Sequence, residues 1–134
     1  MAPASFEKEQ ISVCGFGSEL DLISRTKAKA WLSLTPANEN GVVESYDNVK
    51  CARVIVNIDS LSDDLANEVV NQVEMLPRPL VISCASGARA SSVAWLHIAK
   101  KNDMTFADVS KEASGSPWMS KPPLFRWVKD GISA

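Results

Sequence analysis

A cysteine and an arginine separated by four residues form the most chemically informative pattern of this sequence. Cys84 follows the apolar segment 79–83, and Arg89 precedes a helix-like segment over 90–101. The four residues between them are all small: Ala85, Ser86, Gly87 and Ala88. Small residues allow the backbone to curl, so that several N–H groups point toward one centre. The pattern therefore predicts an anion-binding loop at the end of a buried strand.

The same arrangement predicts a reactive thiol. A helix that begins beside Arg89 adds positive potential at its N-terminus, and a guanidinium group binds oxyanions through two parallel hydrogen bonds. In that field the thiol of Cys84 loses its proton more readily, and the thiolate is the nucleophilic form. The structural alternative is a buried cysteine beside a glycine turn, since free cysteine is among the most buried residue types.

Length and composition limit the classes of function. With 134 residues the chain suits one domain with an ordinary core. Its 46% hydrophobic and 22% charged residues fit a soluble globular protein. The net charge of −2 creates no basic field, and no apolar run reaches the roughly 18 residues that span a membrane. We therefore expect neither nucleic acid nor a membrane among its partners.

Cysteine and histidine usage argues against a disulfide framework and a metal site. The chain has three cysteines, Cys14, Cys51 and Cys84, without CxxC spacing. An odd number of unpaired cysteines is typical of a reducing compartment, here the cytoplasm or another soluble one. The single histidine, His97, disfavours most metal sites and Ser–His triads. We expect no metal and no other cofactor.

Strand-like and helix-like segments alternate along the chain. Strands are expected over 11–14, 30–34, 54–58 and 80–84, and helices over 18–29, 60–76, 90–101, 105–113 and 121–129. This alternation predicts an α/β fold, a single three-layer domain in which helices flank a central, mostly parallel sheet of four or five strands. Residues 1–10 are expected to be flexible, and residues 11–134 to form the domain with a helical tail over 105–134. Ligands of such sheets bind beyond the carboxyl ends of the strands, where Cys84 lies.

These elements and the loop resemble two known families. Cys-x-x-Gly-x-Arg resembles the active-site loop of many rhodanese-like sulfurtransferases. The order of elements is similar to the tyrosine-phosphatase-like fold, in particular to the small phosphatase-like domain fused to, or encoded beside, persulfide dioxygenases and β-lactamase-like hydrolases. The similar segments are 15–18, 30–36, 54–58 and 80–95. The resemblance implies, as a partner, a persulfide dioxygenase or another protein of sulfur metabolism.

The length of the loop favours sulfur transfer as the first hypothesis. Cysteine phosphatases resemble one another in having five residues between Cys and Arg, and usually Ser or Thr after the Arg. Here four residues intervene, Ala90 follows, and Ser91 comes one place too late. A shorter ring of donors suits a persulfide sulfur better than a phosphoryl group.

In this hypothesis the Cys84 thiolate takes the outer sulfur of an anionic donor, thiosulfate or a persulfide. The N–H groups of residues 85–89 hold the resulting Cys84 persulfide, and Arg89 orients the donor. A thiol acceptor such as glutathione then removes the sulfur. The reaction needs no general acid, because thiolates are adequate leaving groups.

Two other functions stay open. A cysteine-dependent phosphatase would use Cys84 as nucleophile, Arg89 as phosphoryl ligand and Asp59, at the end of the 54–58 segment, as general acid. Asp63 and Asp64 compete for that role, although acidic residues in the first turn of a helix also complement its dipole. The third function is a catalytically inactive module whose loop binds an anion or a partner.

Overall fold

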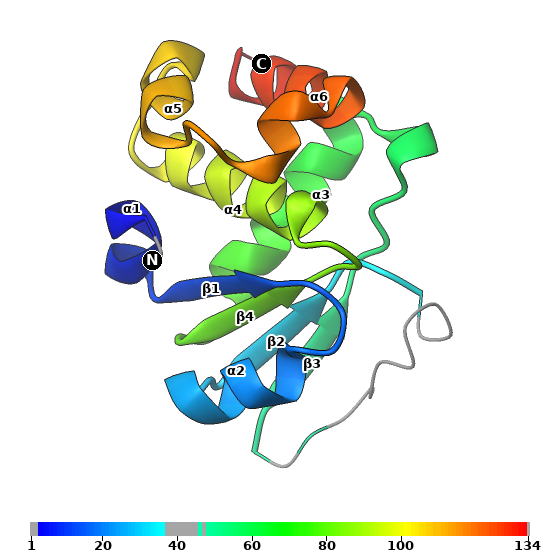
Figure 1. Cartoon of the computed structure of the whole chain (residues 1–134), viewed down its shortest axis with the longest axis vertical. Helices are drawn as coiled ribbons and strands as arrows, with labels where there is room; N and C mark the ends of the chain where they lie inside the picture. The colour runs from blue at the N-terminus through cyan, green and yellow to red at the C-terminus, as the bar shows by residue number, and fades with distance from the viewer. Residues whose placement is uncertain (1–2, 37–45, 47, 134) are drawn as a thin grey trace.

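Four parallel strands form the sheet of the protein. The computed structural model describes residues 3–36, 46 and 48–133. Within these residues the strands are β1 (Ile11–Cys14), β2 (Ala30–Ser33), β3 (Lys50–Arg53) and β4 (Leu80–Ser83), in the order β1–β4–β2–β3 (Figure 1). Ser33 lies opposite both Arg53 and Ser83, so the carboxyl ends of three strands are level. The predicted parallel α/β sheet is confirmed, with four strands in the described part.

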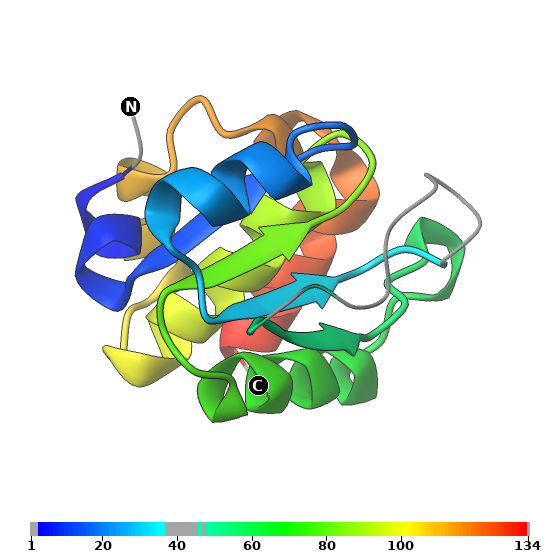
Figure 2. The same cartoon turned by 90° about the horizontal axis from the view of Figure 1, so that it is seen from below.

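Helices cover both faces of this sheet. They are α1 (Ala4–Glu9), α2 (Glu19–Thr26), α3 (Asp63–Met75), α4 (Ala88–Lys101), α5 (Phe106–Glu112) and α6 (Pro122–Ser133), with short 3-10 turns η1 (Ile58–Ser60) and η2 (Pro117–Ser120). Helix α2 lies on one face of the sheet (Figure 2), and the remaining helices lie on the other. Within the described residues, none of these helices has the length and hydropathy that crossing a membrane requires.

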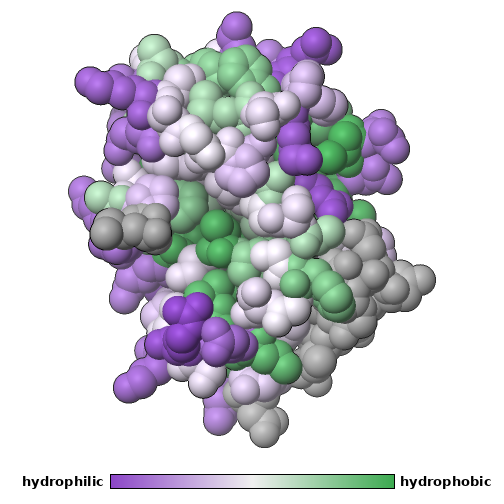
Figure 3. Space-filling model, viewed as in Figure 1, coloured by the Kyte–Doolittle hydropathy of each residue, from purple (hydrophilic) through white to green (hydrophobic). Residues whose placement is uncertain are grey.

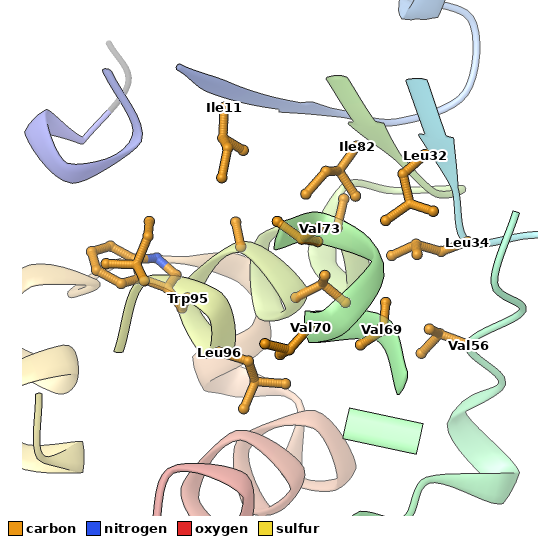
Figure 4. Close-up of a cluster of buried hydrophobic side chains, with 14 of the residues drawn as sticks. Ile11, Leu32, Leu34, Val56, Val69, Val70, Val73, Ile82, Trp95 and Leu96 are labelled. Carbon is orange, nitrogen blue, oxygen red and sulfur yellow. The ribbon is translucent and has the colours of Figure 1, made fainter. Parts of the chain in front are cut away.

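The core follows from the alternation of side chains along each strand. Leu32 and Ile82 point toward α3 and α4, where they join Val73 in the larger core (Figure 4). Trp31 and Val81, one residue earlier on the same strands, point toward α2 and form the smaller core. Because both faces are covered, the central strands consist almost entirely of buried residues.

The third strand lies earlier in the chain than predicted. The β-branched segment 54–58 was expected to be a strand, but the ladder with β2 is formed by Lys50–Arg53. The N–H of Val54 still donates to the carbonyl oxygen of Ser33, and the N–H of Val56 to that of Leu34. The segment is therefore extended beside β2 up to η1. β-branching predicted the extended backbone correctly, but the register decides which residues form the ladder.

The start of α3 also differs from the prediction. The helix was expected to begin at residue 60, but Ser60 ends η1. The hydroxyl of Ser62 is the actual cap, and it accepts a hydrogen bond from the N–H of Leu65 at 3.1 Å. Two serines lie within one turn of each other, and the chain turns at the first one before the helix begins at the second.

Part of the N-terminal segment is helical. Residues 1–10 were expected to be flexible, whereas residues 4–9 form α1. Phe6 is only 2% exposed, and its ring centroid lies 5.3 Å from that of Trp95 in α4. Burial of this aromatic ring fixes the helix on the domain. The predicted helical tail over 105–134 contains α5 and α6, and its Trp118 and Trp127 belong to the larger core.

Candidate active site

The loop between Cys84 and Arg89 lies at the carboxyl edge of the sheet. Cys84 directly follows β4, and α4 begins only four residues later, at Ala88. Gly87 precedes that helix with a φ of 92°, in the left-handed region that glycine adopts at no steric cost. This conformation turns the backbone sharply within the loop. The sequence prediction of a tight loop of small residues between strand and helix is therefore consistent with the observed geometry.

Two backbone N–H groups converge on the thiol of Cys84. The N–H of Gly87 donates to Sγ at 3.0 Å, and that of Ala90 donates at 3.3 Å. Cys84 is 1% exposed, so these hydrogen bonds are shielded from water. The two donors hold the sulfur between the loop and the first turn of α4. Ala90 was outside the predicted ring of donors, and its N–H is available because the first N–H groups of a helix have no partner within it.

Other N–H groups of the loop remain available to a ligand. Among the residues that the structure describes, none accepts a hydrogen bond from the backbone N–H of Ala85 or Ser86. The N–H of Ala88 makes a long contact of 3.5 Å with the hydroxyl of Ser86. The loop therefore combines donors that hold the sulfur with further donors beside it, the chemistry of an anion site.

Arg89 connects the loop to the segment that follows β3. Its Nη1 donates to the carbonyl oxygen of Val56 at 2.9 Å, and the residue is half-buried. This hydrogen bond fixes the guanidinium between α4 and the extended segment after β3. The sequence placed Arg89 beside Cys84, but only the fold could place it beside Val56.

Asp59 lies on the same segment as Val56, whose carbonyl oxygen accepts the hydrogen bond from Arg89. It is the central residue of η1, three residues after Val56, and its side chain is exposed. It lines a cavity of about 420 Å³ between η1 and α6, together with Arg126 and Trp127. Cys84 is not among the residues that line this cavity. Asp59, the acid expected from the sequence, is thus three residues away from the backbone carbonyl that binds Arg89.

The loop after β1 supports the Cys84 loop from one side. The N–H of Phe16 donates to the carbonyl oxygen of Ala85 at 2.8 Å. A Cβ atom on Gly15 would lie only 2.7 Å from that same oxygen, so the two backbones approach too closely for any side chain there. Glu19, which is buried, accepts a hydrogen bond from the N–H of Gly17 at 2.8 Å and fixes the support. From the sequence, this segment was singled out only because residues 15–18 resemble the phosphatase-like family.

Cys14 lies near the site but differs from Cys84 in environment. It contacts the smaller core beside α2, whereas Cys84 belongs to the larger core on the other face of the sheet. Burial, followed by the negative charge of Glu19 and by Cys84, raises the pKa of the Cys14 thiol to about 12. Burial also raises the pKa of Cys51. Both thiols therefore stay protonated and weakly nucleophilic at neutral pH.

Comparisons with solved structures identify the fold. The structure of DUSP15 superposes with a TM-score of 0.70 at 12% identity, covering 94% of this chain and 85% of that one. TpbA from P. aeruginosa, in complex with phosphotyrosine, gives a TM-score of 0.70 at 15% identity, covering 92% and 83%. A putative phosphatase from Shewanella putrefaciens gives 0.66 at 13%, covering 92% and 87%.

These likenesses show that the chain has the fold of tyrosine-phosphatase-like cysteine phosphatases. Comparison with family models and with curated proteins gave no match. The predicted phosphatase-like fold is confirmed. The rhodanese resemblance and the association with persulfide dioxygenases find no support in these structures and stay predictions.

Proposed function

We propose that this protein is a cysteine-dependent phosphatase that hydrolyses phosphate monoesters through a phosphocysteine on Cys84. The observation that carries the proposal is the pair of N–H groups, from Gly87 and Ala90, that hold the Cys84 sulfur at the N-terminus of α4. They hold the attacking sulfur at the point where a loop of further donors can bind the phosphoryl oxygens. The fold shared with cysteine phosphatases supports the same assignment.

In the first step the Cys84 thiolate attacks phosphorus, an S–P bond forms and the P–O bond to the leaving group breaks. The carboxyl group of Asp59 gives its proton to the leaving oxygen. The guanidinium of Arg89 and the N–H groups of the loop neutralise the charge on the phosphoryl oxygens. In the second step water attacks phosphorus, the S–P bond breaks, and Asp59 regains a proton from that water. The products are the alcohol, inorganic phosphate and the free thiolate.

The second step is expected to be the slow one. The residue after Arg89 is Ala90, so no hydroxyl follows the arginine to assist departure of the thiolate. The N–H of Ala90 donates to Sγ and supplies part of that stabilisation. Because no hydroxyl adds to these N–H donors, we expect the phosphocysteine to accumulate during turnover.

Sulfur transfer is the second candidate, and one observation favours it. Only four residues separate Cys84 from Arg89, and Arg89 is the sole charged residue of that loop. A short and nearly neutral ring suits a persulfide sulfur. In this reaction the thiolate attacks the outer sulfur of a persulfide, the donor leaves as a thiolate, and a second thiol removes the sulfur from Cys84.

One set of mass and rate measurements separates the two functions. With p-nitrophenyl phosphate, the wild-type protein should show a burst of product and a mass gain of about 80 Da on Cys84, and Cys84→Ser should show neither. Asp59→Asn should reduce turnover by about 10²-fold and affect esters of poor leaving groups most.

With glutathione persulfide, a gain of about 32 Da that added thiol removes would instead indicate sulfur transfer. The phosphatase assignment is rejected if ester hydrolysis does not exceed that of Cys84→Ser. The absence of both adducts would favour an inactive binding module.

A further inference from the structure

Exposed apolar side chains are concentrated around the Cys84 loop. Six large apolar side chains of the described residues are exposed, and four of them belong to the segments that follow β1 and β3: Phe16, Leu20, Ile55 and Ile58. Scattered exposed apolar residues are ordinary, but several at one edge mark a binding surface. The face shown in Figure 3 carries mostly neutral and hydrophobic side chains across its middle, and hydrophilic ones gather toward its margins. We refer to these four residues as the apolar rim.

Hydrogen bonds join each half of the apolar rim to the Cys84 loop. On one side, the N–H of Phe16 donates to the carbonyl oxygen of Ala85 at 2.8 Å. On the other side, Arg89 donates to the carbonyl oxygen of Val56 at 2.9 Å. Figures 1 and 2 both show the loop after β4 between the loop after β1 and η1. A phosphate ester bound at the Cys84 loop therefore has its organic part between the two halves of the rim.

The alternation of side chains explains why the second half is exposed. The segment after β3 is extended, and its Val54 and Val56 are buried in the larger core. Because successive side chains of an extended chain point to opposite sides, Ile55 points away from that core and is 51% exposed. Ile58 lies in η1 and lines the cavity that Asp59 also lines. The rim therefore continues to the residue that acts as acid in the proposed mechanism.

The distance between the two halves limits the kind of substrate that can contact both. The carboxyl ends of the four strands are level, and their order is β1–β4–β2–β3. With about 4.8 Å between neighbouring strands, the end of β4 lies about 5 Å from that of β1 and about 10 Å from that of β3. One aryl ring is too short to contact both halves. An extended peptide rises about 3.3 Å per residue, so five residues cover the whole span.

We propose that the phosphorylated residue of the substrate belongs to an extended peptide segment with large apolar side chains on both sides, which contact the two halves of the apolar rim. This inference rests on the phosphatase function proposed above. With the phosphorylated residue at Cys84, an apolar side chain two residues away on one side reaches Phe16, and one three residues away on the other side reaches Ile55. Phe16 and Ile55 are therefore specificity-determining residues.

The charges beside the apolar rim favour a peptide over a lipid surface. Segments 15–20 and 54–64 contain the acidic residues Glu19, Asp59, Asp63 and Asp64 and no lysine or arginine. Surfaces that bind anionic lipids carry basic residues beside their apolar ones, so these segments would be repelled by such a membrane. For the same reason we expect the residues next to the phosphorylated one to be neutral or basic.

Four phosphotyrosine peptides of equal length test the inference. They carry leucine two and three residues from the phosphotyrosine on both sides, on the N-terminal side only, on the C-terminal side only, or on neither side, with serine in the other positions. We expect kcat/KM to rise about tenfold for each apolar side, because each buries an exposed side chain of the rim. Phe16→Ser should abolish the gain from one side only, and Ile55→Ser that from the other. Hydrolysis of p-nitrophenyl phosphate by each variant serves as the reference for the chemical step.

Met75→Ser is the matched control, because Met75 is 72% exposed and ends α3 at the amino edge of the sheet. It should keep the preferences of the wild type. Equal hydrolysis of the four peptides, or unchanged preferences in Phe16→Ser and Ile55→Ser, would overturn the inference and leave the phosphatase function standing. If neither the peptides nor p-nitrophenyl phosphate are hydrolysed faster than by Cys84→Ser, both proposals fail. Faster hydrolysis of an alkyl phosphate in phosphatidylcholine vesicles than of the best peptide would assign the rim to lipid and also overturn the inference.

Discussion

The two edges of the sheet carry polar groups of opposite kinds. At the carboxyl edge, the thiol of Cys84 accepts hydrogen bonds from the backbone N–H groups of Gly87 and Ala90. At the amino edge, before β1 and β4, the buried side chains of Glu9 and His97 meet two cationic side chains that are not fully buried. Glu9 accepts a hydrogen bond from Lys101 at 3.1 Å, and its Oε1 lies 3.1 Å from Nε2 of His97.

Arg78 completes the cluster at the amino edge. It donates to backbone carbonyl oxygens of Glu9, Val73 and Leu76 at 2.7 to 3.0 Å, and so joins α1 to the end of α3. Backbone donors do not titrate and keep their place when side chains change, whereas the buried carboxylate of Glu9 depends on the side chains that pair with it. We therefore expect the carboxyl edge to determine reactivity and the amino edge to determine stability.

Exchange of arginine for lysine tests this division most strongly. Arg89→Lys keeps the charge but loses the planar fork that binds two phosphoryl oxygens, so kcat/KM for an aryl phosphate should fall about 10³-fold. Arg78→Lys at the other edge should keep kcat/KM within about threefold and lower the free energy of unfolding by about 2 kcal/mol, because buried carbonyl oxygens lose donors. Steady-state kinetics and urea unfolding measure the two quantities. A reversed pattern would contradict the division.

A pair of glycine substitutions separates contact from conformation at the carboxyl edge. In Gly15→Ala the new Cβ lies 2.7 Å from the carbonyl oxygen of Ala85, so the Cys84 loop must shift and kcat should fall by about 10²-fold. Gly17→Ala places its Cβ in open space, but φ is +93°, so the cost is about 1 kcal/mol of stability with kcat retained. Equal losses of kcat in both variants would contradict the support proposed for this loop.

Acidification should weaken the amino edge first. Burial lowers the pKa of His97, and Glu9 has a lowered pKa because hydrogen bonds from Lys101 and His97 outweigh its burial. In both cases the unfolded chain binds protons more readily than the folded one. Stability is therefore full above the ordinary pKa of histidine, near 6.5, and is lost as the pH falls below it and then below the ordinary pKa of glutamate.

Urea unfolding between pH 7.5 and pH 4.5 measures this effect. One proton taken up on unfolding changes the free energy of unfolding by at most about 1.4 kcal/mol per pH unit. His97→Gln should flatten the decline near pH 6. If the free energy of unfolding of the wild type stays constant over this range, protonation of His97 and Glu9 does not affect stability and the prediction is refuted.

The loop at the carboxyl edge could be predicted from the sequence because its residues are contiguous. The contacts at the amino edge could not. A strand, a loop of small residues and an arginine are contiguous, so the Cys84 loop and the order of elements could be derived from neighbouring residues. The contact of Arg89 with Val56 joins residues 33 positions apart, and that of Glu9 with His97 joins residues 88 apart. Such pairs depend on strand order and register, which periodicity does not specify. For the same reason β-branching at 54–58 indicated extended backbone but placed the ladder too late.

Cys14 gives the smallest and most discriminating test of the carboxyl edge. The carbonyl oxygen of Cys14 accepts a hydrogen bond from the N–H of Cys84 at 3.2 Å. The side chain of Cys14 packs against the smaller core, on the face of the sheet that α2 covers. Its pKa is raised to about 12, so we expect it to stay protonated throughout the neutral range. Cys14→Ser should change kcat/KM by less than about twofold, since the backbone hydrogen bond is kept. Iodoacetamide at pH 7.5, followed by peptide mass mapping, should leave Cys14 unmodified in the folded protein. Rapid labelling of Cys14, or loss of activity in Cys14→Ser, would mean that reactivity at this edge is shared between two thiols instead of being confined to the one that the N–H groups hold.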